Sequence, residues 1–190
     1  TTGKNADVAL VFARSGAAGP GGISAFIVPT DSPGYVVTRV ESKLGQRASD
    51  TCQIALEDVR VPLANRLGQE GEGYRIALSN LQGGRIGIAS QAVGIGRAAC
   101  EVAMAYARER QVFGRPIIEH QAVGFRLAAM LTRIESARQM VWHAASLSDA
   151  GQPCLMEACM AKLLASEAAE WVCSEAIQTL GGYGYLTSIW

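Results

Sequence analysis

The sequence changes character sharply near residue 62, and this change limits what the chain can fold into. Before it, short runs rich in β-branched and aromatic residues alternate with turn residues such as glycine and proline. The runs that predict strands are 7–14, 22–29, 35–40 and 52–61. Residues 1–62 are therefore predicted to form part of an antiparallel β-domain whose strands lack some partners and leave open edges.

After Pro62 the apolar residues recur at helical spacing. Pro116 and Pro153 divide this part into three long segments, roughly 71–109, 117–150 and 153–180. The middle segment carries an apolar seam whose members are spaced alternately by four and three: Val123, Leu127, Met130, Ile134, Ala137, Val141 and Ala144. Because the links between segments are short, neighbouring helices are expected to run antiparallel in a bundle.

Composition excludes several classes of function. Lys+Arg and Asp+Glu are both 17, and no basic run suits nucleic acid or an anionic membrane surface. The five cysteines form no CxxC pair, and with two histidines there is no zinc-type spacing, so we expect free thiols in a reducing compartment. The chain starts without Met and ends on an apolar stretch, and both ends are expected to be cuts through a larger protein.

The first helical segment contains glycines although its apolar pattern predicts a helix. Each interior glycine lowers the stability of a helix by about 1 kcal/mol relative to Ala. For Gly94 and Gly96, close helix packing and a functional role stay open. For 82–85 a binding role is favoured, because bare backbone beside a cationic side chain lets a flat or thioester-bearing ligand lie against the helix. The candidate substrate-binding residues are Gln82, Gly83, Gly84 and Arg85, although Arg85 alone is also compatible with a surface or ion-paired arginine.

The junction between the first two helical segments is the second candidate site. Arginines at 108, 110 and 115 flank Phe113, and Gln121 follows. A guanidinium group matches phosphate oxygens in a fixed fork, which suits a pyrophosphate. The alternative is that these arginines offset the dipole at a helix C-terminus.

A Gly-Gly-x-Gly turn in 178–185 is the third candidate, because bare backbone at a helix end lets a ligand approach. No strand precedes it, so it is not a dinucleotide fingerprint. The polar loop 43–51 either hydrogen-bonds a ligand or builds a turn. His143 is interpreted as an interfacial residue of a helix. No Ser/His/Asp constellation is evident.

These motifs, in this order, resemble the acyl-CoA dehydrogenase family. Lys-Leu-Gly-Gln-Arg-Ala-Ser-Asp-Thr at 43–51 and Leu-Glu-Asp-Val-Arg-Val-Pro at 56–62 are similar to the end of its β-domain. Gly-Gly-Arg-Ile-Gly-Ile-Ala at 83–89 is similar to its first long C-terminal helix. Arg-Gln-Val-Phe-Gly at 110–114, with His120 and Gln121, resembles its flavin-contacting junction, and 178–185 resembles its Gln-x-x-Gly-Gly-x-Gly signature.

The resemblance implies an α+β fold. Residues 1–62 form the C-terminal part of the middle β-barrel domain, and residues 63–190 form most of a C-terminal antiparallel four-helix bundle. It implies FAD-dependent α,β-dehydrogenation of an acyl-CoA thioester, in fatty acid or branched-chain amino acid catabolism, with electrons leaving to an electron-transfer flavoprotein. It further implies a homotetramer, in which several contacts reach the flavin of a neighbouring subunit, located in the bacterial cytoplasm or the mitochondrial matrix.

Carried over by position, two groups of residues are expected to contact FAD: Arg110, Phe113, His120 and Gln121 at the junction, and Gln178, Gly181 and Gly182 in the glycine turn. The catalytic glutamate is expected beyond Trp190, and the position that carries it in a minority of the family is Gly84. An acyl-CoA oxidase and a non-catalytic scaffold of the same fold stay open. The motifs resemble short-chain or short branched-chain members.

Overall fold

The structure is a computed structural model that describes residues 1–186. It divides the chain into two compact units, Thr1–Ser79 and Asn80–Trp190. The long helix α1 (Gly73–Glu109) begins in the first unit and runs into the second. The predicted domain boundary after residue 62 stays a prediction.

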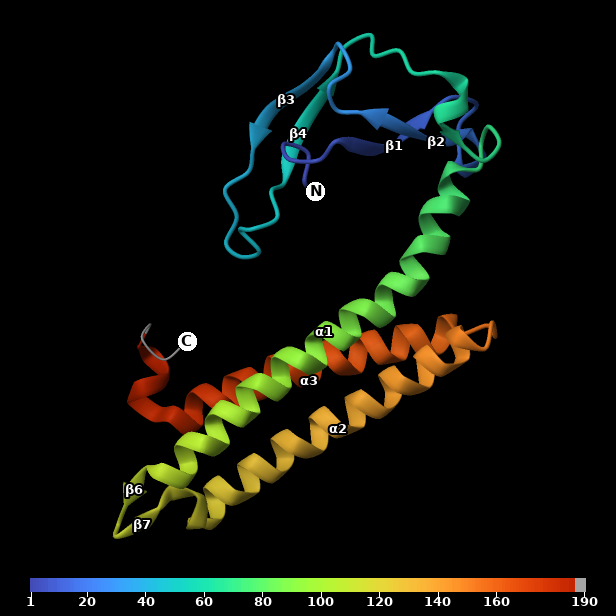
Figure 1. Ribbon diagram of the computed structural model, residues 1–190. Coiled ribbons are helices and arrows are strands. Elements are labelled where there is room, and N and C mark those ends of the chain that lie inside the picture. The colour runs from blue at the N-terminus through green and yellow to red at the C-terminus, as the bar shows by residue number, and fades with distance from the viewer. Residues whose placement is uncertain (187–190) are drawn as a thin grey trace. The chain divides into compact units, whose positions relative to one another are not determined.

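The first unit is built from two small antiparallel sheets (Figure 1). β1 (Val8–Arg14) pairs with β2 (Ile23–Pro29), whose other edge takes the short β5 (Arg66–Leu67). β3 (Tyr35–Val40) pairs with β4 (Cys52–Leu56). The predicted antiparallel β-structure is present, and short 3-10 helices (Pro20–Gly22 and Leu63–Asn65) lie in the connections.

Two details of this unit differ from the sequence-based expectation. β4 ends at Leu56 instead of continuing to residue 61, because the chain turns at Asp58, where φ is 51°. The two-residue strand β5 lies beyond residue 62, where no strand was predicted. A strand this short has no periodicity of its own, so only its pairing with β2 identifies it.

The second unit contains α1, α2 (Gln121–Asp149) and α3 (Leu155–Leu180), packed around one apolar core (Figure 1). Six of the seven seam residues predicted on α2 are buried, and Val123 is partly buried against the same core. The core is rich in alanine on all three helices, and small side chains let helix axes approach closely. Residues 1–186 thus contain three long helices of the predicted bundle. None of them combines the length and the apolarity needed to cross a bilayer.

The two glycines left open in α1 have different surroundings. A Cβ on Gly96 would lie 2.3 Å from Cδ1 of Ile134, a core residue of α2, and 3.4 Å from Cα of Ala169. A Cβ on Gly94 would meet no atom within 4 Å. Close helix packing therefore explains Gly96 and does not explain Gly94.

Candidate functional site

The junction between α1 and α2 is a small β-hairpin rather than a plain turn. β6 (Gln111–Val112) pairs antiparallel with β7 (Arg115–Pro116), and a 3-10 turn (Ile117–Glu119) leads to α2. Phe113 and Gly114 form its tip with φ of 52° and 79°, the left-handed values that a tight hairpin requires. Phe113 is 93% exposed there. α2 consequently begins at Gln121, later than the predicted residue 117, and Pro116 lies in β7.

His120 joins this hairpin to α2. Its backbone carbonyl accepts the amides of Val123 (2.9 Å) and Gly124 (3.0 Å), which begins the helix. Its ring turns back to the hairpin, with Nε2 3.0 Å from the carbonyl oxygen of Val112 and Nδ1 3.4 Å from Nη2 of Arg115. The rings of His120 and Phe113 meet edge to face, with centroids 6.1 Å apart.

The Gly-Gly-x-Gly segment ends α3 as predicted. The helix stops at Leu180, Gly181 has φ of 58°, and a 3-10 helix (Gly181–Tyr185) follows. Gln178, Gly181 and Gly182 are exposed, and a Cβ on either of these two glycines would meet no atom within 4 Å. Gly184 is different, because a Cβ there would lie 2.6 Å from the carbonyl oxygen of Ile177. Gly184 therefore permits close packing of the turn, while the first two glycines leave bare backbone open.

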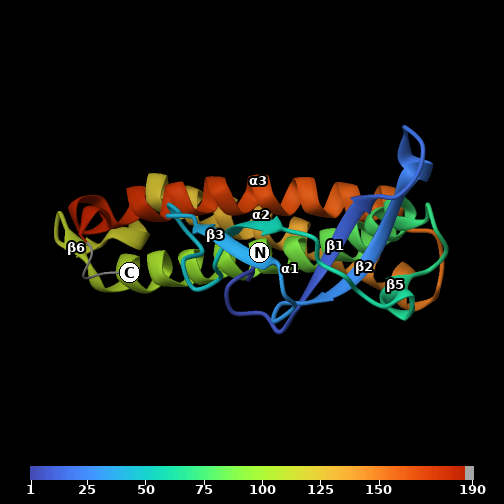
Figure 2. The same cartoon turned by 90° about the horizontal axis from the view of Figure 1, so that it is seen from above.

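The hairpin and the glycine turn lie at the same end of the helices (Figures 1 and 2). The rings of Tyr106 and Tyr183 contact each other with centroids 5.9 Å apart, and the carbonyl of Tyr106 accepts the amide of Arg110 at 2.9 Å. Nearby, Nε of Arg126 on α2 lies 2.8 Å from Oε2 of Glu175 on α3. Two segments nearly 70 positions apart in the sequence are thus brought together.

The predicted substrate segment lies elsewhere. Nε2 of Gln82 donates to Sγ of Cys154, which precedes α3, so this segment lies near the opposite end of the helices. Arg85 and Glu109, the last residue of α1, are separated along the helix by roughly 36 Å, at 1.5 Å rise per residue. Gly83 and Gly84 are exposed, and a Cβ on either would meet no atom within 4 Å. One chain therefore does not bring the predicted substrate segment and the predicted FAD-contacting segments into a single pocket.

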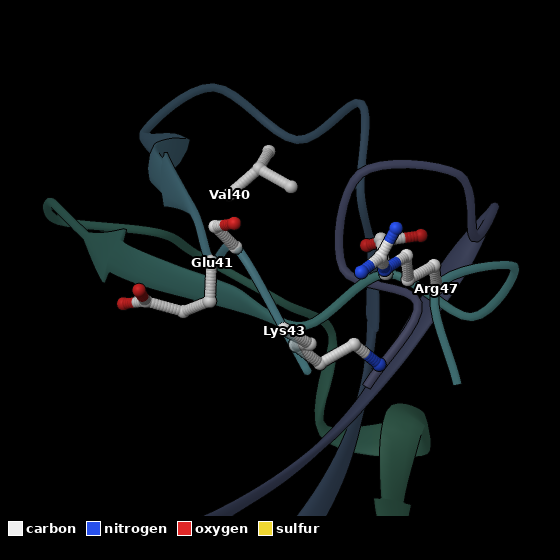
Figure 3. Close-up of a pocket in the computed structure, with 6 residues that line it drawn as sticks. Val40, Glu41, Lys43 and Arg47 are labelled. Carbon is white, nitrogen blue, oxygen red and sulfur yellow. The ribbon is translucent and has the colours of Figure 1, made fainter. Parts of the chain in front are cut away.

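The polar loop 43–51 lines a pocket of about 400 Å³ in the first unit (Figure 3). Two of its charged residues have structural partners: Nζ of Lys43 donates to the carbonyl of Ser49, and Asp50 accepts hydrogen bonds from the amide of Lys4 (3.0 Å) and the side chain of Asn5 (2.8 Å). The hydrogen bond from Cys52, followed by that from Lys4, lowers the pKa of Asp50 to about 2. The same contact with Asp50 raises the pKa of the Cys52 thiol. These contacts favour the turn-building interpretation of the loop.

Several residues that organise the site were not singled out by the sequence. Tyr106, Arg126 and Glu175 carry no local motif, and their partners lie on other helices, so only the packed structure identifies them. Burial raises the pKa of the Cys100 and Cys173 thiols, which agrees with cysteines that act as small core residues. All five cysteines, within the described residues, are free.

Comparisons with known proteins agree with this architecture. Residues 71–190 match the family model of the acyl-CoA dehydrogenase C-terminal domain, and residues 1–59 match that of the middle domain. An acyl-CoA dehydrogenase of Bacillus subtilis is 49% identical over 187 residues, which cover 98% of this chain and 49% of that protein.

Two solved structures are similar in fold. Butyryl-CoA dehydrogenase from Megasphaera elsdenii is 43% identical, with a TM-score of 0.92 over 95% of this chain and 48% of its own. A chain in the structure of the electron transferring flavoprotein of Acidaminococcus fermentans is 46% identical, with a TM-score of 0.94. This match covers 98% of the present chain and 50% of that chain. The chain spans about half the length of the curated relatives it matches. With its two family-model matches in chain order, the chain belongs to the acyl-CoA dehydrogenase family.

Proposed function

We propose that this chain acts within a complete acyl-CoA dehydrogenase subunit, which uses FAD to introduce an α,β double bond into an acyl-CoA thioester. The observation that carries the proposal is the meeting of the hairpin and the glycine turn at one end of the helices. These are the two segments that the family resemblance assigns to FAD. FAD, when bound, supplies the acceptor for the hydride that leaves the substrate.

The exposed groups at this end fit FAD. Among residues 1–186, no ion pair engages Arg110, so its guanidinium is available to a pyrophosphate. Phe113 presents an aromatic face, and Gln121 lies at the N-terminus of a long helix, where backbone amides favour an anion. Gly181 and Gly182 let the ligand reach the backbone. Together with His120 and Gln178, these residues are the proposed cofactor-binding set.

The proposed substrate-binding residues are Gln82, Gly83, Gly84 and Arg85. The two glycines leave the surface of α1 open, so the flat thioester and pantetheine region can lie against the helix. Gly84 has no side chain that accepts a proton, so we assign the α-proton to a carboxylate outside this segment. The glutamate expected after Trp190 lies outside the described residues.

The proposed substrate-binding and FAD-binding residues lie near opposite ends of α1. This separation supports an oligomer in which one subunit completes the flavin site of another. We therefore propose a homotetramer, as is usual in the family. The electron acceptor is proposed to be an electron-transfer flavoprotein, since a chain with the same fold occurs in the structure of such a protein. The similarity to butyryl-CoA dehydrogenase favours short acyl chains. The proposed location is the cytoplasm in a bacterium and the mitochondrial matrix in a eukaryote.

The test is the flavin content of purified complete subunits that carry this chain. Arg110→Ala and Phe113→Ala are each expected to lower the ratio of FAD to protein, because they remove a pyrophosphate partner and an aromatic contact. Arg97→Ala is the matched control, since this arginine lies on α1, the helix that leads to the hairpin, and its side chain is 62% exposed and paired with Glu101. Full flavin content in both test variants would remove the hairpin from the proposed cofactor site.

A further inference from the structure

The ring of His120 faces the β6–β7 hairpin and makes one polar contact to each of its strands. Nε2 lies 3.0 Å from the carbonyl oxygen of Val112 in β6, and Nδ1 lies 3.4 Å from Nη2 of Arg115 in β7. The backbone of the same residue begins α2. His120 thus connects a helix of the bundle core to both strands beneath the exposed tip.

The chemistry of the two partners determines the state of the ring. A carbonyl oxygen only accepts hydrogen bonds, so Nε2 must carry a proton and donate it. A guanidinium group only donates, so Nδ1 must keep its lone pair and accept. The neutral ring with its proton on Nε2 satisfies both contacts at once. Both ring nitrogens of His120 therefore have partners in the hairpin.

The hairpin needs such support. It contains two ladder pairs, 111 with 116 and 112 with 115, and an isolated two-stranded hairpin is marginally stable in water. Its tip places Phe113, a non-glycine residue, in the left-handed region. The amide of Ile117 donates to the carbonyl of Arg110 at 2.8 Å and closes the base of the hairpin. Nearer the tip, the ring of His120 supplies the connection to α2.

We infer that His120 is a positioning residue: it holds the β6–β7 hairpin so that Phe113 stays presented at the tip, and it acts through the hairpin rather than by touching the cofactor. This role rests on the proposed function of the hairpin in flavin binding. It also changes the assignment that the family resemblance gives to His120. The ring contact with Phe113, at 6.1 Å between centroids, is the most direct link between the two residues.

Two substitutions separate the contacts of the ring. In His120→Gln, the amide nitrogen reaches the place of Nε2 and keeps a donor for Val112. In His120→Asn, the shorter side chain reaches only the place of Nδ1 and loses that donor. The same substitutions at His143, an exposed residue of α2, are the matched controls. Hydrogen–deuterium exchange is measured on the complete subunit, comparing residues 110–117 with residues 155–180 of α3, and FAD dissociation is measured on the same samples.

The inference predicts that His120→Asn speeds exchange in 110–117 by a factor on the order of five to ten, the loss of about one hydrogen bond. Exchange in 155–180 should not change. His120→Gln should restore protection to within about twofold of the original chain, since its donor replaces that of Nε2. FAD should dissociate faster from His120→Asn than from His120→Gln, and the His143 variants should match the unaltered subunit in both measurements.

Three results would overturn the inference. The first is unchanged exchange in 110–117 in His120→Asn, and the second is an equal rise in 155–180, which indicates a general loss of stability. The third is faster FAD loss from His120→Asn without a loosened hairpin, which indicates direct contact. The proposed function is tested by a different measurement. If it is wrong, Arg110→Ala and Phe113→Ala keep full flavin content, and the exchange data still decide whether His120 holds the hairpin.

Discussion

The rings of Tyr106 and Tyr183 contact each other with centroids 5.9 Å apart and planes tilted by 55°. Tyr106 lies in the last turn of α1, immediately before the hairpin, and Tyr183 lies in the middle of the Gly-Gly-x-Gly turn. The pair therefore joins the two segments proposed to contact FAD.

A double-mutant cycle on this pair measures how strongly the segments are coupled. We expect Tyr106→Ala and Tyr183→Ala to show a coupling free energy of about 0.5–1.5 kcal/mol in urea unfolding, the usual range for aromatic pairs. Tyr185→Ala combined with Tyr106→Ala is the control, because Tyr185 is 91% exposed. Additive effects in the Tyr106–Tyr183 cycle would show that the rings do not hold the segments together.

The glycines of α1 provide a test of the helix packing. Gly96→Ala should destabilise the chain, because overpacking against Ile134 costs about 1–3 kcal/mol and outweighs a gain of about 1 kcal/mol in helix propensity. Gly94→Ala gains the propensity without the clash and should raise the free energy of unfolding by up to about 1 kcal/mol. Thermal unfolding of both variants checks this, and an inverted order would show that α1 packs differently.

Asp50 predicts a pH dependence of stability in the first unit. Its pKa falls from an ordinary value of 3.8 to about 2 on folding, because Cys52, Lys4 and Asn5 donate hydrogen bonds to the carboxylate. A lowered pKa in the folded state contributes stability above the unfolded value, and this contribution is lost as pH falls from about 4 to about 2. Asp50→Asn should therefore be less stable than the original chain at neutral pH.

The stability difference between Asp50→Asn and the original chain should shrink as the pH falls through about 2, because Asp50 is half protonated there and mostly neutral below it. Urea unfolding at several pH values measures it, with Asp31→Asn in an exposed turn as the matched control. A stability difference that stays constant with pH would mean that the hydrogen bonds to Asp50 do not favour its charged form.

The long helices could be predicted because their signals are local and repeated. The segments 71–109 and 153–180 end at the same residues as α1 and α3, where Glu109 precedes the hairpin and Gly181 adopts a positive φ. The alternating spacing of the α2 seam identified the buried face, because a helix places such residues on one side.

The β6–β7 hairpin could not be predicted in the same way. Two-residue strands have no periodicity, and Phe-Gly at a tip is a weaker signal than Asn-Gly. The sequence predicts a helix start near Pro116, whereas this residue lies in β7 and ends the hairpin. The different surroundings of Gly94 and Gly96 depend on Ile134 of another helix, which no local pattern reports.

The candidate site was predicted as three separate motifs, and their arrangement needed the fold. The motifs at 110–121 and 178–182 meet through Tyr106 and Tyr183, whereas 82–85 lies near the other end of the helices with Gln82 against Cys154. The sequence supplies the residue types, but the distance between them follows from helix length and packing. Their roles in FAD and substrate binding stay predictions.

The most direct test of the proposed function is the flavin spectrum of the complete subunit that carries this chain, recorded without oxygen during titration with butyryl-CoA. If the subunit is an FAD-dependent acyl-CoA dehydrogenase of short acyl chains, the visible absorbance of oxidised flavin should fall as hydride leaves the substrate. A panel of longer and branched acyl-CoA thioesters distinguishes a different chain preference from a lack of activity. Bound flavin that stays oxidised with every thioester would contradict the proposal.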